Sequence, residues 1–436
     1  MSAFTKGTKG TKGTKDTKDT KDSMDAMNRL KTLASPLAVA FAVVVASVHA
    51  QSPSEWPQWR GPAREGTATF AAPATWPAAL TKRWEVSVGA GHSSPVATGD
   101  RVIIHTRQGD REVTRALALA TGKEIWRSDY AAPYTMNSAA RGHGPGPKST
   151  PAVAEGRVFT FGISGIVSAH DVATGKVLWR IDAPPAPPEF GTAMSPIVDG
   201  SLVIVHLGAN DQGALTAFDA ASGKPRWRWT GDGPAYASPV LAEIGGTRQL
   251  VTQSENAVIG IDAASGQLLW QVPFRTSYDQ NSITPVVVGD MVIFSGLDSG
   301  TTAVRVVRKG SVWATEPVWK NERTSMYMSS PVVIGSTLYG LSHRNSGQFF
   351  ALDTASGRTL WTTPGREGEN ASIIAAGSLL LLSTTNGELI VARAAPDKFS
   401  EIKRYSTAES AVWAHPAVFG NTILVKDVDK LICWTL

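Results

Sequence analysis

The chain has 436 residues, of which 42% are hydrophobic and 18% are charged, a balance that fits a globular protein with a large core. Residues 1–50 carry eight Lys/Arg and four Asp/Glu, and the remainder carries a nearly balanced 34 and 33, so we expect no nucleic-acid partner. The single cysteine, Cys433, excludes an intrachain disulfide and a cysteine-based metal cluster.

The chain begins with a low-complexity tail over residues 1–26, in which Thr-Lys repeats offer nothing apolar to bury. The sequence predicts disorder for this tail. Because the repeats precede a signal for export, we infer that translation begins at Met24 or Met27.

Residues 27–50 are predicted to be a signal peptide. Arg29 and Lys31 precede an apolar run, and residues 48–50 place small side chains at the two positions that a signal peptidase reads. We therefore expect cleavage before Gln51 and export to the periplasm or out of the cell. The apolar run is too short for a comfortable membrane span, so we expect no stable membrane anchor.

After the signal, a sequence motif recurs about every 45 residues. It consists of Ser/Thr-Pro, an apolar pair, a turn and a β-branched run. In residues 196–205, two apolar runs flank Asp199-Gly200, a dipeptide suited to a tight turn, so each copy is predicted to be a β-hairpin. Copies begin at Ser94, Thr150, Ser195, Ser238, Thr284 and Ser330, with weaker ones at Ser372 and His415.

A second motif, Ala-x-Asp-x-x-Thr/Ser-Gly-x-x-x-Trp, is clearest at residues 169–179. It predicts another hairpin, because the Asp and Ser/Thr side chains can bond turn amides and the Gly accepts a positive φ. The final Trp is a large plate able to cover a neighbouring turn. We predict structural docking roles for Trp126, Trp179, Trp227, Trp270 and Trp361.

The two hairpins make a four-stranded unit that cannot bury both faces alone, and radial packing of the copies solves this problem. The sequence thus predicts an all-β, eight-bladed propeller of antiparallel blades over residues 80–436, preceded by an N-terminal extension at 51–79. The last copy has no room for a fourth strand, and residues 83–88 could supply it by joining the two ends of the chain. Seven blades is the alternative if the unit near 372–405 packs irregularly. We expect a monomer.

The second motif, which ends in Trp, resembles the tryptophan-docking motif of the pyrroloquinoline-quinone (PQQ) type propeller repeat, and the resemblance covers residues 80–436. The segment Trp56-Pro57-Gln58-Trp59-Arg60-Gly61-Pro62 resembles the mature N-terminus of exported bacterial members, and residues 141–151 and 413–416 also look like that subgroup.

Two branches with this repeat are the quinoprotein alcohol dehydrogenases and the outer-membrane assembly lipoprotein BamB. The sequence lacks the adjacent cysteines and the Glu, Asn and Asp ligand loop that the resemblance to the dehydrogenases implies. We therefore expect no cofactor, with PQQ and calcium as the alternative. Gln51 stands where the lipoprotein carries its lipid-bearing cysteine.

Residues just before the Ser/Thr-Pro pairs should cluster at one mouth of the central channel, covered by the insertion at 130–148 as a lid. They form a polar and aromatic set suited to a small polar molecule or a peptide, although they could instead plug the channel. The predicted ligand-binding residues are His92, Lys148, Tyr236, Asn281, Tyr327, Trp413 and His415.

No residues are assigned to catalysis or to a metal. His92, His143 and His415 could converge, but they belong to separate repeats without local ligand spacing. No Gly-x-Ser-x-Gly turn supports a hydrolase.

The sequence favours a non-catalytic propeller that binds an envelope protein or a small polar ligand as a scaffolding module. The alternatives are a PQQ-dependent oxidoreductase with a divergent site and a BamB-like outer-membrane protein assembly factor.

Overall fold

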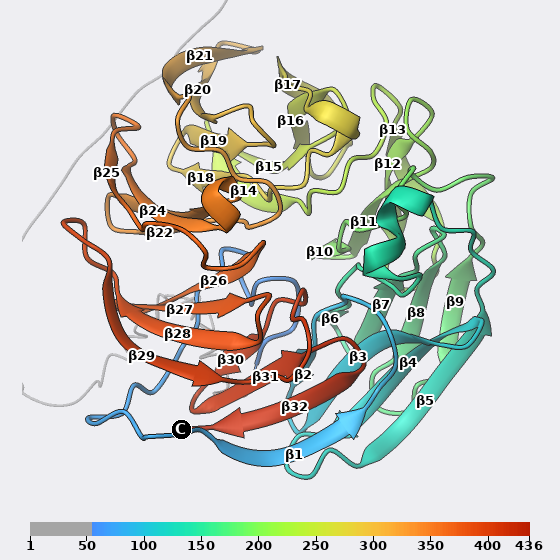
Figure 1. Ribbon diagram of the computed structural model, residues 1–436. Helices are drawn as coiled ribbons and strands as arrows, with labels where there is room; N and C mark the ends of the chain where they lie inside the picture. The colour runs from blue at the N-terminus through green and yellow to red at the C-terminus, as the bar shows by residue number, and fades with distance from the viewer. Residues whose placement is uncertain (1–54) are drawn as a thin grey trace, which may run out of the picture. The chain divides into compact units, whose positions relative to one another are not determined.

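The computed structural model describes residues 55–436, which form eight four-stranded antiparallel sheets arranged as the blades of a propeller (Figure 1). The predicted tail at 1–26 and signal peptide at 27–50 lie outside the described residues. The predicted eight-bladed, all-β fold is confirmed. In the described part of the chain, no helix is long and apolar enough to cross a membrane.

The blades follow one another along the chain, and only short 3-10 turns interrupt them: η1 (Ser138–His143), η2 (Ser277–Asp279) and η3 (Arg344–Ser346). The first four blades are β2–β5 (Val96–Thr98, Arg101–Gln108, Arg111–Ala118, Glu124–Ala131), β6–β9 (Ala152–Ala154, Arg157–Phe161, Val167–Asp171, Val177–Ile181), β10–β13 (Ile197–Asp199, Leu202–Leu207, Ala214–Asp219, Pro225–Trp229) and β14–β17 (Val240–Ile244, Thr247–Gln253, Ala257–Asp262, Leu268–Pro273). The next three are β18–β21 (Val286–Val288, Met291–Ser295, Thr301–Lys309, Val312–Asn321), β22–β25 (Val332–Ile334, Thr337–Ser342, Gln348–Asp353, Thr359–Thr362) and β26–β29 (Ala371–Ala376, Leu379–Thr384, Glu388–Arg393, Ser400–Ser406).

The eighth blade closes the ring by combining the two ends of the described chain. Its strands β30–β32 (Ala417–Phe419, Thr422–Lys426, Lys430–Thr435) are completed by β1 (Thr81–Ser87), which pairs antiparallel with β32 and sets Trp84 opposite Cys433. The predicted closure is therefore confirmed. The seven-blade alternative is wrong, because the segment around 372–405 forms the regular blade β26–β29.

The predicted inner hairpin appears in its simplest form between β10 and β11. Ile197 pairs with Ile204 and Asp199 with Leu202 across a turn in which Gly200 has a φ of 52°. Such a positive φ is readily available only to glycine. The middle strands are buried on both faces because each blade lies between two others, which explains their almost continuously apolar sequences.

Tryptophans join neighbouring blades at most of the seams. The indole Nε1 of Trp227 donates to the Ala263 carbonyl (3.1 Å) in the next blade, and its ring covers Gly266 there. Trp126, Trp179 and Trp361 make the matching bonds to Val172, Ala220 and Ala395. The same kind of bond joins Trp84 to the Leu119 carbonyl and Trp319 to the Thr354 carbonyl. The sequence motif does not identify these two tryptophans.

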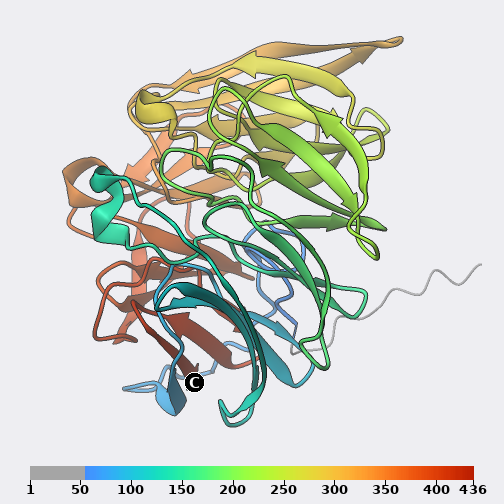
Figure 2. The same ribbon diagram turned by 90° about the vertical axis from the view of Figure 1, so that its right-hand side faces the viewer.

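Trp270 is placed differently from the expectation. Its Nε1 donates to Gln249 Oε1 (2.7 Å) in its own blade, and its ring lies over Gly260 of that blade. The next blade continues in the long hairpin β20–β21, which turns at Gly310-Ser311 without the Asp-x-x-Ser/Thr-Gly motif (Figure 2). Trp270 therefore has no matching turn to cover.

Residues 55–71 lie inside the ring, at its centre, and we call them the plug (blue in Figure 1). Backbone bonds join Trp56 to Ala97, Pro57 to Val153, Ala68 to Ala375 and Ala71 to Gly420. Side chains reach the other four blades: Arg64 bonds the Pro196 and Pro239 carbonyls, Trp59 bonds Thr284 and Arg60 bonds the Pro331 carbonyl. The plug thus contacts all eight blades.

Candidate functional site

A cavity of about 440 Å³ lies in the loops that lead into the inner strands, at one mouth of the channel. This volume is within the range of small-molecule sites. Five of the seven predicted binding residues line it: His92, Lys148, Tyr236, Tyr327 and Trp413. Binding of a ligand there remains a prediction.

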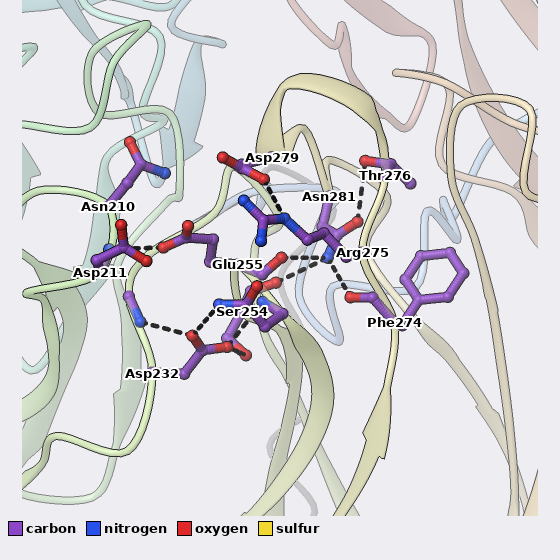
Figure 3. Close-up of polar contacts among 12 residues, drawn as sticks. Asn210, Asp211, Asp232, Ser254, Glu255, Phe274, Arg275, Thr276, Asp279 and Asn281 are labelled. Atoms are coloured by element: carbon purple, nitrogen blue, oxygen red, sulfur yellow. Dashed lines mark hydrogen bonds and ion pairs between the residues drawn. The ribbon is translucent and has the colours of Figure 1, made fainter.

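Asn281 is not among the lining residues but holds the loops beside the cavity together (Figure 3). It is fully buried, and its amide nitrogen donates to the carbonyls of Ser254 (2.8 Å), Glu255 (3.1 Å) and Phe274 (2.9 Å). All of its amide protons are therefore used by backbone groups. Asn281 shapes the wall behind Gln280 and Ser282, which do line the cavity.

His415 also lies outside the lining, on the plug. Its ring stacks at 6.2 Å from Trp56 and meets the edge of Trp59 at 5.4 Å, measured between ring centroids. Burial, together with the nearby charge of Arg60, lowers its pKa to about 3. His415 is consequently neutral at physiological pH and packs as an aromatic ring.

His92, His143 and Trp413 form an aromatic corner of the cavity. The ring of His143 lies 4.7 Å from Trp413 and 5.6 Å from His92, both edge to face. Burial lowers the pKa of His92 to about 3 and also lowers the pKa of His143. Among residues 55–436, no three His, Cys, Asp or Glu side chains are placed to hold a metal ion.

The insertion at 130–148 brings η1 and His143 to this corner, and Ala139 and Ala140 line the cavity beside it. The insertion thus forms part of the wall at the mouth, on the side where a lid was expected.

Lys148 is the cation of the cavity. Its Nζ donates to the Phe190 carbonyl (2.8 Å), and burial lowers its pKa to about 8. The positive charge of a second buried lysine, Lys426, acts to lower the pKa of His92. The Nζ of Lys426 donates to the carbonyls of Gly91, Asp427 and Val428. Both ammonium groups bond backbone carbonyls rather than carboxylates.

The two tyrosines predicted from the sequence, Tyr236 and Tyr327, present neutral phenols to the cavity. The Tyr236 hydroxyl accepts a bond from the Phe190 amide (3.2 Å), and the Tyr327 hydroxyl donates to Gln280 Oε1. Burial is the main cause that raises the pKa of both phenols.

Sequence reasoning missed three aromatic side chains of the lining: Trp59, Phe190 and Tyr278. Trp59 belongs to the recognised Trp-Pro-Gln-Trp segment, but its place in the cavity depends on the plug entering the ring. Tyr278 adopts a φ of 61° in η2 and is 71% exposed, a strained and accessible position that no sequence signal marks.

The fold and the cavity define an eight-bladed propeller whose channel is filled by its own N-terminal segment, with a small aromatic pocket at one mouth. The family model described as "Outer membrane protein assembly factor BamB" matches residues 109–363, which is more than half of the chain. The chain belongs to this family.

Curated relatives agree with this assignment, and solved structures share the fold. The outer membrane protein assembly factor BamB of Yersinia pestis is 26% identical over 302 residues, which cover 65% of this chain and 70% of that protein. The crystal structure of BamB from Moraxella catarrhalis has a TM-score of 0.60 at 16% identity, covering 82% of this chain and 98% of that one. A quinohemoprotein alcohol dehydrogenase from Comamonas testosteroni has a TM-score of 0.64 at 12% identity, covering 88% and 80%. Identities this low in the two solved structures show a shared fold alone.

The dehydrogenase fold raises the question of whether the cavity suits PQQ with calcium. Calcium prefers several oxygen ligands, with carboxylates prominent among them. The lining residues include no Asp and no Glu, and their side-chain oxygens come from serine, tyrosine, glutamine and asparagine. The residues present do not fit a calcium-bound quinone.

Proposed function

We propose that this chain is an exported, non-catalytic binding module of the cell envelope that takes part in outer-membrane protein assembly. The observation that carries the proposal is the family match over residues 109–363, which joins the chain to proteins described as outer membrane protein assembly factors. The partner is then a protein of the envelope, bound by the loops and edges of the propeller.

The architecture supports a scaffolding role. Because the plug contacts every blade, the blades are held to a common centre as well as to their neighbours. A ring tied together in this way is suited to presenting its loops in fixed positions to a large partner.

A deletion strain tests the proposal. We expect lower amounts of folded outer-membrane β-barrel proteins, measured by heat-modifiable gel mobility, and restoration by the full-length chain. A chain that starts at Gln51, and so lacks the signal, is the control and should fail to restore them. Unchanged barrel proteins in the deletion strain would contradict the assembly role.

Sequencing the N-terminus of the exported protein checks the localisation. We expect the mature chain to begin at Gln51. An uncleaved chain retained in the cytoplasm would contradict the proposed export.

A further inference from the structure

Four buried cations lie in the plug or beside the cavity without a carboxylate partner. Arg60, Arg64 and Lys426 are almost completely buried, and Lys148 is largely so. Their hydrogen-bond acceptors are backbone carbonyls, apart from the Gln58 side chain that Arg64 also contacts. None of the four forms an ion pair within residues 55–436. Of the four, Lys148 and Lys426 act electrostatically on His92 in the cavity, and the charge of Lys426 is opposed by the neighbouring Asp427 and Asp429. The positive potential that favours an anion in the cavity therefore comes mainly from Lys148.

Two groups in the cavity have unused hydrogen-bonding capacity. An ammonium group has three donors, and Lys148 Nζ uses one of them on the Phe190 carbonyl. The buried Nε2 of His92 has no partner among the described residues, and Lys148 is close enough to lower the pKa of His92. An anionic oxygen beside Lys148 Nζ would accept one of its free N–H groups, and the neutral His92 adds a second donor in the tautomer that carries its proton on Nε2.

The remaining walls are flat and aromatic. Trp59 comes from the plug, Tyr236, Tyr327 and Trp413 come from three different parts of the ring, and all four line one cavity. Rings of this kind bind planar apolar groups by stacked and edge-to-face contacts. No acidic side chain lines the cavity to repel an anion.

The geometry points to a binding site for an aromatic monocarboxylate, with its carboxylate at Lys148 and His92 and its ring held among the tryptophans and tyrosines. This inference does not depend on the proposed assembly role, because it concerns the cavity and not the outer surfaces that a protein partner would contact.

Acidic groups around the cavity limit the ligand to one negative charge. The negative charge of Glu369 acts to raise the pKa of His143, and the charges of Glu189 and Asp279 act to raise the pKa of Tyr236. None of these three acidic residues lines the cavity. A second carboxylate reaching the rim would meet these charges. Polycarboxylates should therefore bind less well than monocarboxylates.

The test is a calorimetric titration of the purified 51–436 chain with 2-naphthoate and with its neutral amide, 2-naphthamide. We expect saturable binding of the acid, and binding of the amide weaker by about tenfold or more, since a charge-assisted hydrogen bond is lost. Equal binding of the two, or no saturable binding of the acid at millimolar concentration, would overturn the inference. This comparison needs no variant.

Two variants locate the carboxylate. Lys148→Met should weaken binding of the acid about tenfold and leave binding of the amide nearly unchanged. Lys176→Met, at an exposed lysine outside the cavity, is the matched control and should bind both as before. Tighter binding of 2-naphthyl phosphate or of 2,6-naphthalenedicarboxylate than of 2-naphthoate would also contradict the assignment.

Discussion

The indole of Trp227 reaches across a seam of the ring to donate a hydrogen bond of 3.1 Å to the carbonyl of Ala263. Most of the neighbouring blades are joined in this way, so each such tryptophan stabilises two blades at once. In a repeat fold, the interfaces between neighbours carry a large share of the stability.

Replacing this tryptophan should therefore weaken the whole ring. We expect Trp227→Ala to lower the free energy of unfolding by about 3 kcal/mol, at the low end for a buried aromatic because the ring is partly exposed. Denaturant unfolding followed by fluorescence measures the loss. Trp227→Phe, which keeps much of the packing, should lower the free energy of unfolding clearly less than Trp227→Ala does. Equal losses for the two variants would argue against a packing role.

The turn beneath Trp227 gives a second prediction. A Cβ at Gly266 would lie 2.5 Å from the Trp227 ring and require a φ of 75°, so Gly266→Ala meets both a clash and backbone strain. Gly246, with a φ of 71° and nothing within 4 Å of the added carbon, is the matched control. We expect Gly246→Ala to cost about 1 kcal/mol and Gly266→Ala clearly more, by denaturant unfolding. Similar costs would mean that Trp227 moves aside freely.

The plug should be essential for the stability of the ring. Arg64→Met leaves the carbonyls of Ser195, Pro196 and Pro239 without their donor, and should cost about 3–5 kcal/mol. Arg226→Met removes an exposed arginine paired with Asp219 and should cost less than about 1 kcal/mol. If the two variants unfold at the same denaturant concentration, the plug contributes little.

The buried histidines should make the protein less stable in acid. Burial lowers the pKa of His206 to about 4, below its value of about 6.5 in the unfolded chain. Between these values the unfolded state binds a proton that the folded state does not. Stability therefore falls as pH falls from 6.5 towards 4, by about 1.4 kcal/mol per pH unit for each such histidine.

The variant His206→Gln isolates one of these contributions. Its free energy of unfolding should depend less steeply on pH than that of the wild type between pH 6.5 and 4, and equally above pH 7. Denaturant unfolding across this range is the measurement. An unchanged slope would mean that His206 is protonated in the folded protein.

The repeated turns made most of the fold predictable, because each one is specified by neighbouring residues. Asp199-Gly200 closes its hairpin locally, and the strand containing Trp84 was identified as the missing partner of the last blade. The partners of the docking tryptophans could not be predicted from the same local residues, because they belong to the next repeat. Trp270 shows this dependence, since the turn that it would cover is absent from the following blade.

The candidate site was predictable only in part, and for a related reason. His92, Lys148, Tyr236, Tyr327 and Trp413 precede equivalent strands and so reach the same mouth. Asn281 also precedes a Thr-Pro pair, but its amide bonds the backbone of neighbouring loops instead. His415 takes the Ser/Thr place directly before Pro416, and its ring packs against the plug. Trp59 reaches the cavity through contacts more than 200 residues away along the chain, which no local pattern encodes.

The plug also orders the events of biogenesis. Residues 55–71 are synthesised before any blade, yet their final contacts extend to Gly420 in the last one. Until that blade exists, Trp56 lacks the His415 ring that stacks on it, and the end of the plug at Ala71 lacks its backbone bond to Gly420. A chain interrupted before the last blade would thus leave part of the plug without its contacts.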